Sequence, residues 1–216
     1  MKMDRTIQIN GFMKRELLLL LPFIQEPLRN FTLSEIKKAT HTKSHHYAFE
    51  TLKKFTQKKI LIEKRVGNTN IYTLNSIHNE SGPYLSFLES IRKESRPDIP
   101  YDNLLRLTTK IKSSFYVLMI GGSYASSKQK PTSDLDVAFI IPDSHSKKPY
   151  EIAFNEGELM VPEIHGYVFT QTEFYLMLIN DEYNYGKELA RNHILCYGSE
   201  AYYNILFEAI QHGFKG

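Results

Sequence analysis

The chain of 216 residues is long enough for one large domain or two small ones, with a substantial buried core. Its 42% hydrophobic and 24% charged residues are typical of soluble globular proteins and exclude fibrous and disordered classes. A single cysteine, Cys196, excludes a disulfide framework and a cysteine-built metal site, which favours a cytoplasmic location. The longest apolar run, 17–24, is far shorter than the ~20 residues that span a bilayer, so no membrane association is expected.

Three helices are expected in the first sixty residues. Residues 14–25 place apolar side chains on one face, and Pro27 ends that run. Thr32 and Glu35 form a capping-box pattern that begins a second helix, and a third helix is expected over 44–57. Two strands, 60–66 and 70–75, follow as a hairpin that turns at "GNT".

This order of three helices and a hairpin resembles that of winged helix-turn-helix DNA-binding domains, over about 11–75. In that family the third helix enters the major groove and the hairpin touches the DNA backbone. The net charge of +3 is mild, but lysine and arginine crowd residues 53–65, which favours nucleic-acid contact. The basic residues in 53–65 have two other interpretations: they could form the solvated face of a helix, or a surface for protein interaction. The resemblance implies DNA contacts by Lys43, Ser44, His45, Lys53, Lys64, Arg65 and Asn68.

The rest of the chain is expected to be a separate domain. Residues 1–78 would be the winged helix-turn-helix domain and 79–100 a linker with one helix, 84–93. Within 101–216 we expect a first helix, 101–112, and then the continuous apolar runs 115–120 and 135–141, typical of strands covered on both faces. A third strand is expected in 158–169, and helices over 171–179 and 199–213. The fold class is therefore α+β, with a short mixed sheet flanked by helices.

One motif in this second half combines a glycine turn with a pair of carboxylates. The stretch "MIGGSYASSKQKPTSDLDVAFII" puts a turn at a strand-to-helix junction, where free backbone N–H groups can receive phosphate. Asp134 and Asp136 differ by two, so on a strand they point to the same face. Their repulsion would be offset by a hard cation such as Mg²⁺ or Mn²⁺, which also binds nucleotide phosphates. The pattern favours metal-assisted phosphoryl or nucleotidyl transfer.

The spacing Gly-Ser, ten residues, Asp-x-Asp resembles the signature of the nucleotidyltransferase superfamily related to DNA polymerase beta. Its minimal nucleotidyltransferase branch has the longer pattern Gly-Ser-x-Ala-x-Gly, five residues, Ser-Asp-x-Asp. Ser127 replaces the second glycine of that pattern. The positions that match are Gly122, Ser123, Ala125, Ser133, Asp134 and Asp136.

The resemblance implies roles for individual residues. Asp134 and Asp136 would bind the metal ions, and Gly122, Ser123 and Ser133 would bind the nucleotide. The family carries a third carboxylate on a later strand, and Glu163 is the only acidic residue within "MVPEIHGYVF". It would help to activate the attacking hydroxyl. His165 is expected on the same strand face, as a partly buried strand histidine with a hydrogen-bond partner rather than a catalytic group. Glu188, Arg191 and Asn192 are expected to be exposed rather than to line a pocket.

Two functions are compatible with these features. The first is an enzyme that moves a nucleoside monophosphate to a hydroxyl of a protein or small molecule, with release of pyrophosphate; AMP from ATP is the expected case. Relatives in the minimal branch are frequently antitoxins that modify a partner toxin, so a protein acceptor is implied. The alternative is a transcriptional regulator whose transferase domain has lost catalysis and senses a nucleotide or forms a dimer.

Overall fold

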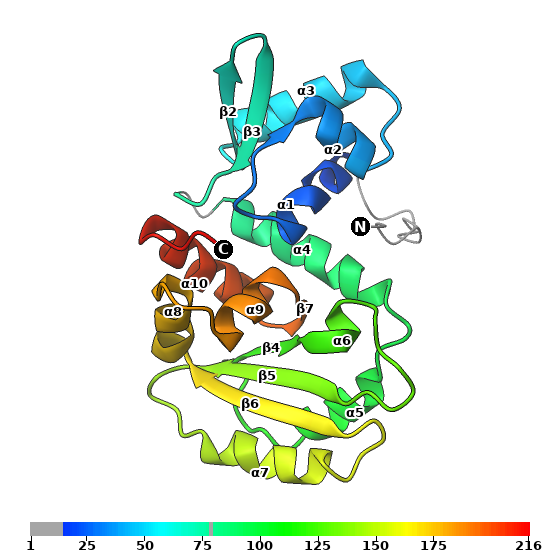
Figure 1. The fold of residues 1–216 in the computed structure, drawn as a ribbon, viewed down its shortest axis with the longest axis vertical. Coiled ribbons are helices and arrows are strands. Elements are labelled where there is room, and N and C mark those ends of the chain that lie inside the picture. Colours follow the sequence, from blue (N-terminus) through cyan, green and yellow to red (C-terminus); the bar gives the residue numbers. More distant parts are fainter. Residues whose placement is uncertain (1–14, 78–79) are drawn as a thin grey trace.

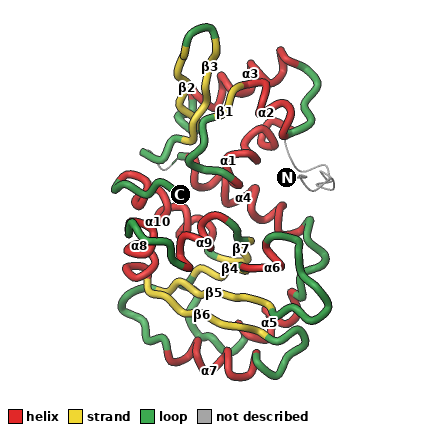
Figure 2. The backbone as a smooth tube through the Cα atoms, viewed as in Figure 1, coloured by secondary structure: helices red, strands yellow, loops and turns green. Residues whose placement is uncertain are grey.

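The computed structural model describes residues 15–77 and 80–216 (Figure 1). The described part of the N-terminal region holds one 3-10 helix, three α-helices and a small antiparallel sheet in the strand order β1-β3-β2. Its β2–β3 hairpin extends away from the rest of the molecule (Figures 1 and 2). The elements are η1 (Arg15–Leu20, a 3-10 helix), α1 (Leu21–Gln25), β1 (Phe31–Thr32), α2 (Leu33–Ala39), α3 (His45–Gln57), β2 (Leu61–Val66) and β3 (Thr69–Leu74).

The expected capping box at the start of α2 is confirmed. The Thr32 hydroxyl accepts the backbone N–H of Glu35, and the Glu35 carboxylate accepts the backbone N–H of Thr32 at 2.8 Å. These two bonds satisfy helix N–H groups that otherwise lack partners. Phe31 and Ile36, on either side of the cap, are both buried in the core that α2 covers.

The C-terminal region is built on a mixed four-stranded sheet in the order β6-β5-β4-β7. Strand β4 is antiparallel to both β5 and β7, whereas β5 and β6 are parallel. This confirms the expected short mixed sheet flanked by helices. The elements are α5 (Tyr101–Thr108), β4 (Val117–Ile120), α6 (Gly122–Ala125), β5 (Leu135–Ile141), α7 (Lys148–Gly157), β6 (Ile164–Thr170), α8 (Gln171–Ile179), α9 (Tyr185–Arg191), β7 (Ile194–Tyr197) and α10 (Ser199–Gln211).

Helices cover both faces of this sheet, as the unbroken apolar strands predict. Alternate residues of β5, such as Val137 and Phe139, are buried in a core shared with α5 and α7. The intervening residues Ala138 and Ile140 face a second core, which α8, α9 and α10 close. Figure 1 shows α7 on the side of the sheet away from α9 and α10.

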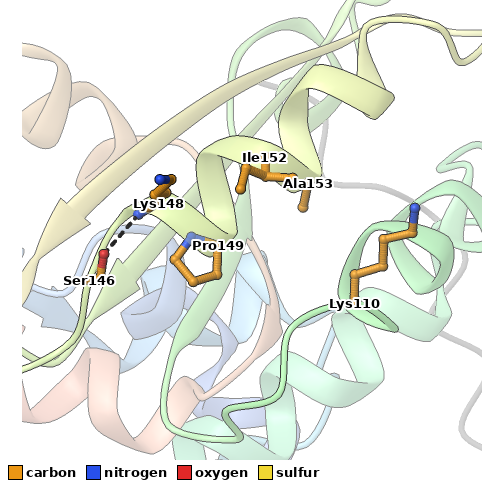
Figure 3. A pocket seen from close by; sticks show the side chains of 6 residues that line it. All are labelled: Lys110, Ser146, Lys148, Pro149, Ile152 and Ala153. Atoms are coloured by element: carbon orange, nitrogen blue, oxygen red, sulfur yellow. Dashed lines mark hydrogen bonds between the residues drawn. The ribbon is translucent and has the colours of Figure 1, made fainter.

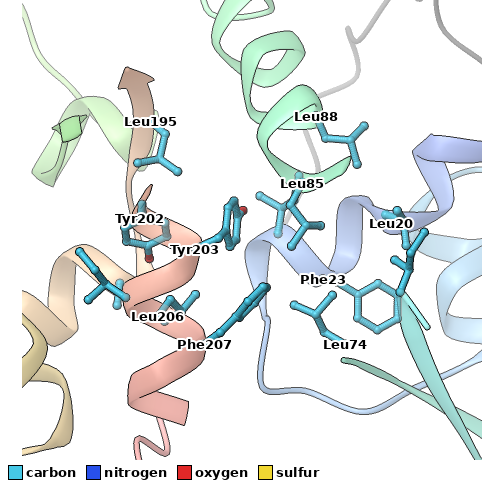
Figure 4. Close-up of a cluster of buried hydrophobic side chains, with 14 of the residues drawn as sticks. Leu20, Phe23, Leu74, Leu85, Leu88, Leu195, Tyr202, Tyr203, Leu206 and Phe207 are labelled. Carbon is cyan, nitrogen blue, oxygen red and sulfur yellow. The ribbon is translucent and has the colours of Figure 1, made fainter. Parts of the chain in front are cut away.

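Helix α4 (Ser81–Glu94) lies between the two regions and packs against both. Leu85 and Leu88 are fully buried, together with Phe23 of α1 on one side and Phe207 of α10 on the other (Figure 4). The segment expected to be a linker therefore contributes to a core that runs from the N-terminal region into the C-terminal helices.

Several expected elements have different bounds. The first helix is a 3-10 helix followed by α1, and Lys14, its expected first residue, lies outside the described residues. The helix expected over 84–93 begins earlier, at Ser81, and the one expected over 101–112 ends at Thr108. The strand expected in 158–169 begins only at Ile164, because residues 158–163 form turns and a cis Val161–Pro162 peptide after α7. Helix α7, helix α9 and strand β7 were not predicted.

Candidate active site

The residues of the glycine and carboxylate motif meet at one end of the sheet. Strand β4 ends at Ile120, and its antiparallel partner β5 begins at Leu135. Strand β6 is parallel to β5 and begins opposite it, with Leu135 and Ile164 in register. The turn after β4 and the segments that enter β5 and β6 therefore lie at the same end of the sheet.

The turn and the second carboxylate are built as one unit. The Gly121 N–H donates to the Asp136 carbonyl at 2.9 Å. Gly122 has φ +56°, and a Cβ atom at this position would lie 1.9 Å from Oδ2 of Asp136. Only glycine combines that left-handed backbone with so close a carboxylate. The sequence predicted both residues as site residues but not their direct contact.

The two aspartates differ in exposure. Asp134 is exposed, whereas the Asp136 side chain is 27% exposed. Burial raises the pKa of Asp136, the charges of Asp134 and Glu188 add to that rise, and His165 opposes it. A carboxylate with a raised pKa carries a charge that its surroundings under-compensate, and a bound cation would offset it. The donor set of two hard oxygen ligands thus fits Mg²⁺ held by one or two carboxylates together with nucleotide phosphates.

Glu163 is placed beside the pair by its backbone. Its carbonyl accepts the Leu135 N–H at 2.8 Å, and its side chain is exposed. The expectation that it lies within the third strand is wrong, because β6 begins one residue later. Among the described residues, no three His, Cys, Asp or Glu side chains are close enough together to hold a metal ion. The role of Glu163 as a third ligand stays a prediction.

His165 is the strand residue opposite Asp136. The two are in register between β5 and β6, and Nδ1 of His165 lies 3.8 Å from Oδ1 of Asp136. The same ring nitrogen is 3.4 Å from the Tyr167 hydroxyl. The predicted hydrogen-bond partner is therefore present, but the predicted partial burial is wrong, because the side chain is 62% exposed at the edge strand.

The serines of the motif have distinct surroundings. Ser123 is half-buried in α6, next to Gly122. The Ser133 hydroxyl accepts the Lys130 N–H at 2.9 Å and so helps to close the loop before Asp134. Ser127 has φ +54°, the left-handed conformation that a glycine at this position of the resembled pattern would adopt readily.

Sequence reasoning missed two groups that α9 and the residues after it bring to the turn. The Tyr185 hydroxyl lies 3.1 Å from where a Cβ of Gly121 would be, and the Asn192 side chain donates to the Gly122 carbonyl at 3.3 Å. Glu188 and Arg191 are exposed, as expected, whereas Asn192 is half-buried. These residues lie more than sixty positions from the turn, so no local spacing indicates the contacts.

The residues expected to contact DNA all lie on the surface of the N-terminal region. Ser44 caps α3, since its hydroxyl accepts the Tyr47 N–H at 3.2 Å, and His45 begins that helix. Lys64 and Arg65 belong to β2, and Asn68 to the turn before β3. Exposed side chains are found at Lys43, Ser44, His45, Lys53, Lys64, Arg65 and Asn68.

A surface hollow of about 360 Å³ lies at the start of α7, away from the residues of the glycine and carboxylate motif (Figure 3). Its lining includes Lys110, Lys148 and Ile152 and none of the motif residues. Helix α7 covers the sheet face opposite the one that Asp136 shares with α9, so the hollow is not part of the candidate active site.

Comparison with known proteins identifies the class of this domain. Residues 107–189 match the family model of the nucleotidyltransferase domain, a range that includes the turn and all three candidate carboxylates. Residues 107–189 therefore form a nucleotidyltransferase domain, a type of domain found in transferase enzymes.

More specific likenesses are few. No curated protein matches the chain. A solved structure described as "Crystal structure of the toxin-antitoxin with AMP-PNP" is similar over 52% of this chain and 87% of its own, at 10% identity and a TM-score of 0.38. A likeness that distant contributes nothing to the assignment. Within the two described ranges, no helix has the length and apolar character needed to cross a bilayer.

Proposed function

We propose that the protein is a metal-dependent nucleotidyltransferase that moves a nucleoside monophosphate, AMP from ATP in the first instance, to a hydroxyl of a protein or small molecule. The observation that carries this proposal is the contact between Gly122 and Asp136, where a Cβ atom would meet the carboxylate at 1.9 Å. A phosphate-receiving turn and a cation-binding carboxylate in direct contact suit a substrate that is a metal-bound triphosphate.

The chain's own residues supply binding, orientation and proton transfer. The turn at Gly122 and Ser123 receives the triphosphate. Asp134 and Asp136 would hold Mg²⁺ or Mn²⁺, and the metal would neutralise phosphate charge. The acceptor oxygen forms a bond to the α-phosphorus while the bond from that phosphorus to the bridging oxygen breaks, and pyrophosphate leaves. Glu163 takes the proton of the acceptor hydroxyl as a general base.

Transfer of label from the four α-³²P nucleoside triphosphates, with cell lysate as acceptor, tests the activity. We expect ATP to label an acceptor in the presence of Mg²⁺ but not of EDTA. Asp134→Asn and Asp136→Asn should abolish labelling, and Glu163→Gln should reduce it roughly 100-fold, the loss of a positioned base. Glu151→Gln is the matched control, because Glu151 is an exposed carboxylate on α7, across the sheet. Labelling that survives Asp136→Asn would refute the assignment.

The alternative, a regulator with a lapsed transferase domain, is favoured by the lack of a three-residue metal group among the described side chains. It makes a different prediction for the same protein. Nucleotide with Mg²⁺ would raise the melting temperature, and ~100 Kd of ligand would add about 2.7 kcal/mol of stability, but no label would be transferred. Binding without transfer across all four nucleotides would establish this alternative.

We also propose that the N-terminal region is a winged helix that binds DNA. The proposal is supported by the element order α1-β1-α2-α3-β2-β3, the projecting hairpin and its exposed basic residues. DNA affinity should fall steeply with salt. Lys53→Met and Arg65→Met each remove one charge that would neutralise a phosphate, so each should lower the slope of log K against log salt by about 0.9. Lys148→Met, on α7, should leave the slope unchanged. Salt-independent or absent binding would leave this region as a protein-interaction module.

A further inference from the structure

Arg96 lies in the segment between α4 and α5 and is buried, with its side chain 8% exposed. Its guanidinium makes a bidentate pair with Asp98, through Nε at 2.8 Å and Nη2 at 2.7 Å. That pair holds the pKa of Asp98 below its ordinary value, although burial opposes the shift. A buried, bidentate arginine has a fixed direction, so its remaining N–H groups point to defined partners.

Those partners are the last carbonyls of α6, the short helix that begins at the glycine turn. Nη2 of Arg96 donates to the Tyr124 carbonyl at 2.5 Å, and Nη1 donates to the Ala125 carbonyl at 3.4 Å. The last carbonyls of a helix have no partner within it, and a cation there interacts favourably with the helix dipole. Arg96 therefore closes the end of a helix of only four residues.

The other end of the same helix carries the candidate nucleotide-binding residues. Gly122 contacts Asp136, and its carbonyl accepts from Asn192. Because α6 spans one turn, a shift at Tyr124 or Ala125 moves Gly122 and Ser123 as well. We call Arg96 and Asp98, with their contacts to α6, the clamp. Gln129, in the loop that leads to the aspartates, is tied to this clamp because its side chain donates to Oδ2 of Asp98 at 2.7 Å.

We propose that Arg96 is a positioning residue for nucleotide transfer, which fixes the glycine turn against Asp136 by holding the end of α6. The residue lies outside the matched nucleotidyltransferase range, 107–189, in the segment that follows α4. Its backbone N–H donates to the Lys93 carbonyl at 3.1 Å, so the clamp is anchored on α4, the helix that packs against the N-terminal region. The kinetic part of this inference rests on the proposed function, but the structural part does not.

Amide hydrogen exchange of the whole protein, without ligand, tests the clamp directly. In Arg96→Met, the amides of Ala125, Ser126, Ser127 and Lys128, which bond within the turn, should exchange about tenfold faster, the loss expected of a charged hydrogen-bonded anchor. Amides of β5 and α10 should keep their protection. Arg106→Met, an exposed arginine on α5, is the matched control.

Arg96→Lys and Asp98→Asn provide graded versions of the same change. A lysine can donate to one carbonyl but cannot keep the bidentate pair, so it should restore part of the protection. Asp98→Asn should loosen the turn less than Arg96→Met does. In a transfer assay the Arg96→Met variant should raise KM for the nucleotide about tenfold, and kcat should change less.

Unchanged exchange at 125–128 in Arg96→Met, with the melting temperature preserved, would overturn the proposal. Uniformly faster exchange across the sheet in all three variants would also overturn it, since Arg96 would then stabilise the fold as a whole. Failure of the wild type to bind or transfer any nucleotide would count against the proposed function, and it would leave the exchange result standing.

Discussion

The two sides of the candidate active site are built differently. On the β4–β5 side, Gly122 lies against Asp136, and Gly121 is enclosed by Tyr185 and Leu189. On the β6 side, Glu163 and His165 are exposed at the start of an edge strand. Tight packing fixes the turn and the Asp136 carboxylate in one geometry, whereas the exposed side chains beside the edge strand are held mainly through the backbone register. The packed side should therefore tolerate substitution least.

Gly122→Ala is the strongest way to test this difference. Its φ of +56° costs an alanine about 1–2 kcal/mol, and the added Cβ must also displace the Asp136 carboxylate. We expect nucleotide transfer to fall roughly 100-fold, since a displacement of about 1 Å at a reacting group has that effect. Single-turnover transfer and chemical denaturation measure the two effects.

Gly67→Ala is the matched control for backbone strain. Gly67 lies in the hairpin turn at φ +59°, and a Cβ there would meet nothing within 4 Å. This variant should lose about 0.5–1 kcal/mol of stability, because the smaller freedom of alanine in the unfolded chain offsets part of the ~1–2 kcal/mol of strain, and it should lose none of the transfer activity. If Gly122→Ala loses no more activity than Gly67→Ala, the close contact with Asp136 has no functional role.

Asp136→Asn should separate stability from activity. Burial raises the pKa of Asp136, so in the folded protein its ionised form is disfavoured. Below pH 3.8 both folded and unfolded chains bind the proton, and the penalty appears as pH rises through the ordinary value and then the raised one. Removing the charge should therefore raise the melting temperature at neutral pH, by an amount that vanishes in acid, while transfer is lost.

Asp143→Asn should have the opposite effect on stability and lower the melting temperature at neutral pH. Hydrogen bonds from Thr172 and Thr170 lower the pKa of Asp143, and the Thr172 N–H donates to it at 3.0 Å. Its ionised form thus stabilises the fold above pH 3.8, and this stabilisation is lost as pH falls through the lowered pKa. Thermal melts of both variants from acid to neutral pH provide the comparison. A lower melting temperature for Asp136→Asn at neutral pH would contradict the view that its charge is under-compensated.

The packed side of the site was also the more predictable one. Gly122, Ser123, Asp134 and Asp136 follow from a fixed spacing within fifteen residues, and local pattern also predicted the capping box of α2. Glu163 was misplaced because the apolar residues 159–161 extend the strand pattern backwards, whereas turns and the cis Val161–Pro162 peptide delay the strand until Ile164.

Contacts from distant segments left no comparable signal. Arg96, Tyr185 and Asn192 reach the turn only through tertiary packing, and β7 is too short, at four residues, for its periodicity to be read. Helix α7 was detectable in principle. Pro149 stands in its first turn, and Tyr150, Ala153, Phe154 and Gly157 recur at helical spacing and are buried.

The smallest effect is expected for Ser127→Gly. The left-handed conformation costs a serine about 1–2 kcal/mol, and the greater freedom of glycine in the unfolded chain offsets roughly half of that, so the variant should gain about 0.5 kcal/mol. Lys59→Gly, at φ +58° outside the site, should gain a similar amount. Transfer should stay within twofold of wild type, because the backbone at Ser127 already has the conformation that a glycine would supply. Denaturation and transfer assays on both variants measure this. A large rise in transfer for Ser127→Gly alone would mean that the serine holds the turn in a less active geometry. The packed side of the site, rather than the exposed side, would then be the one that limits catalysis.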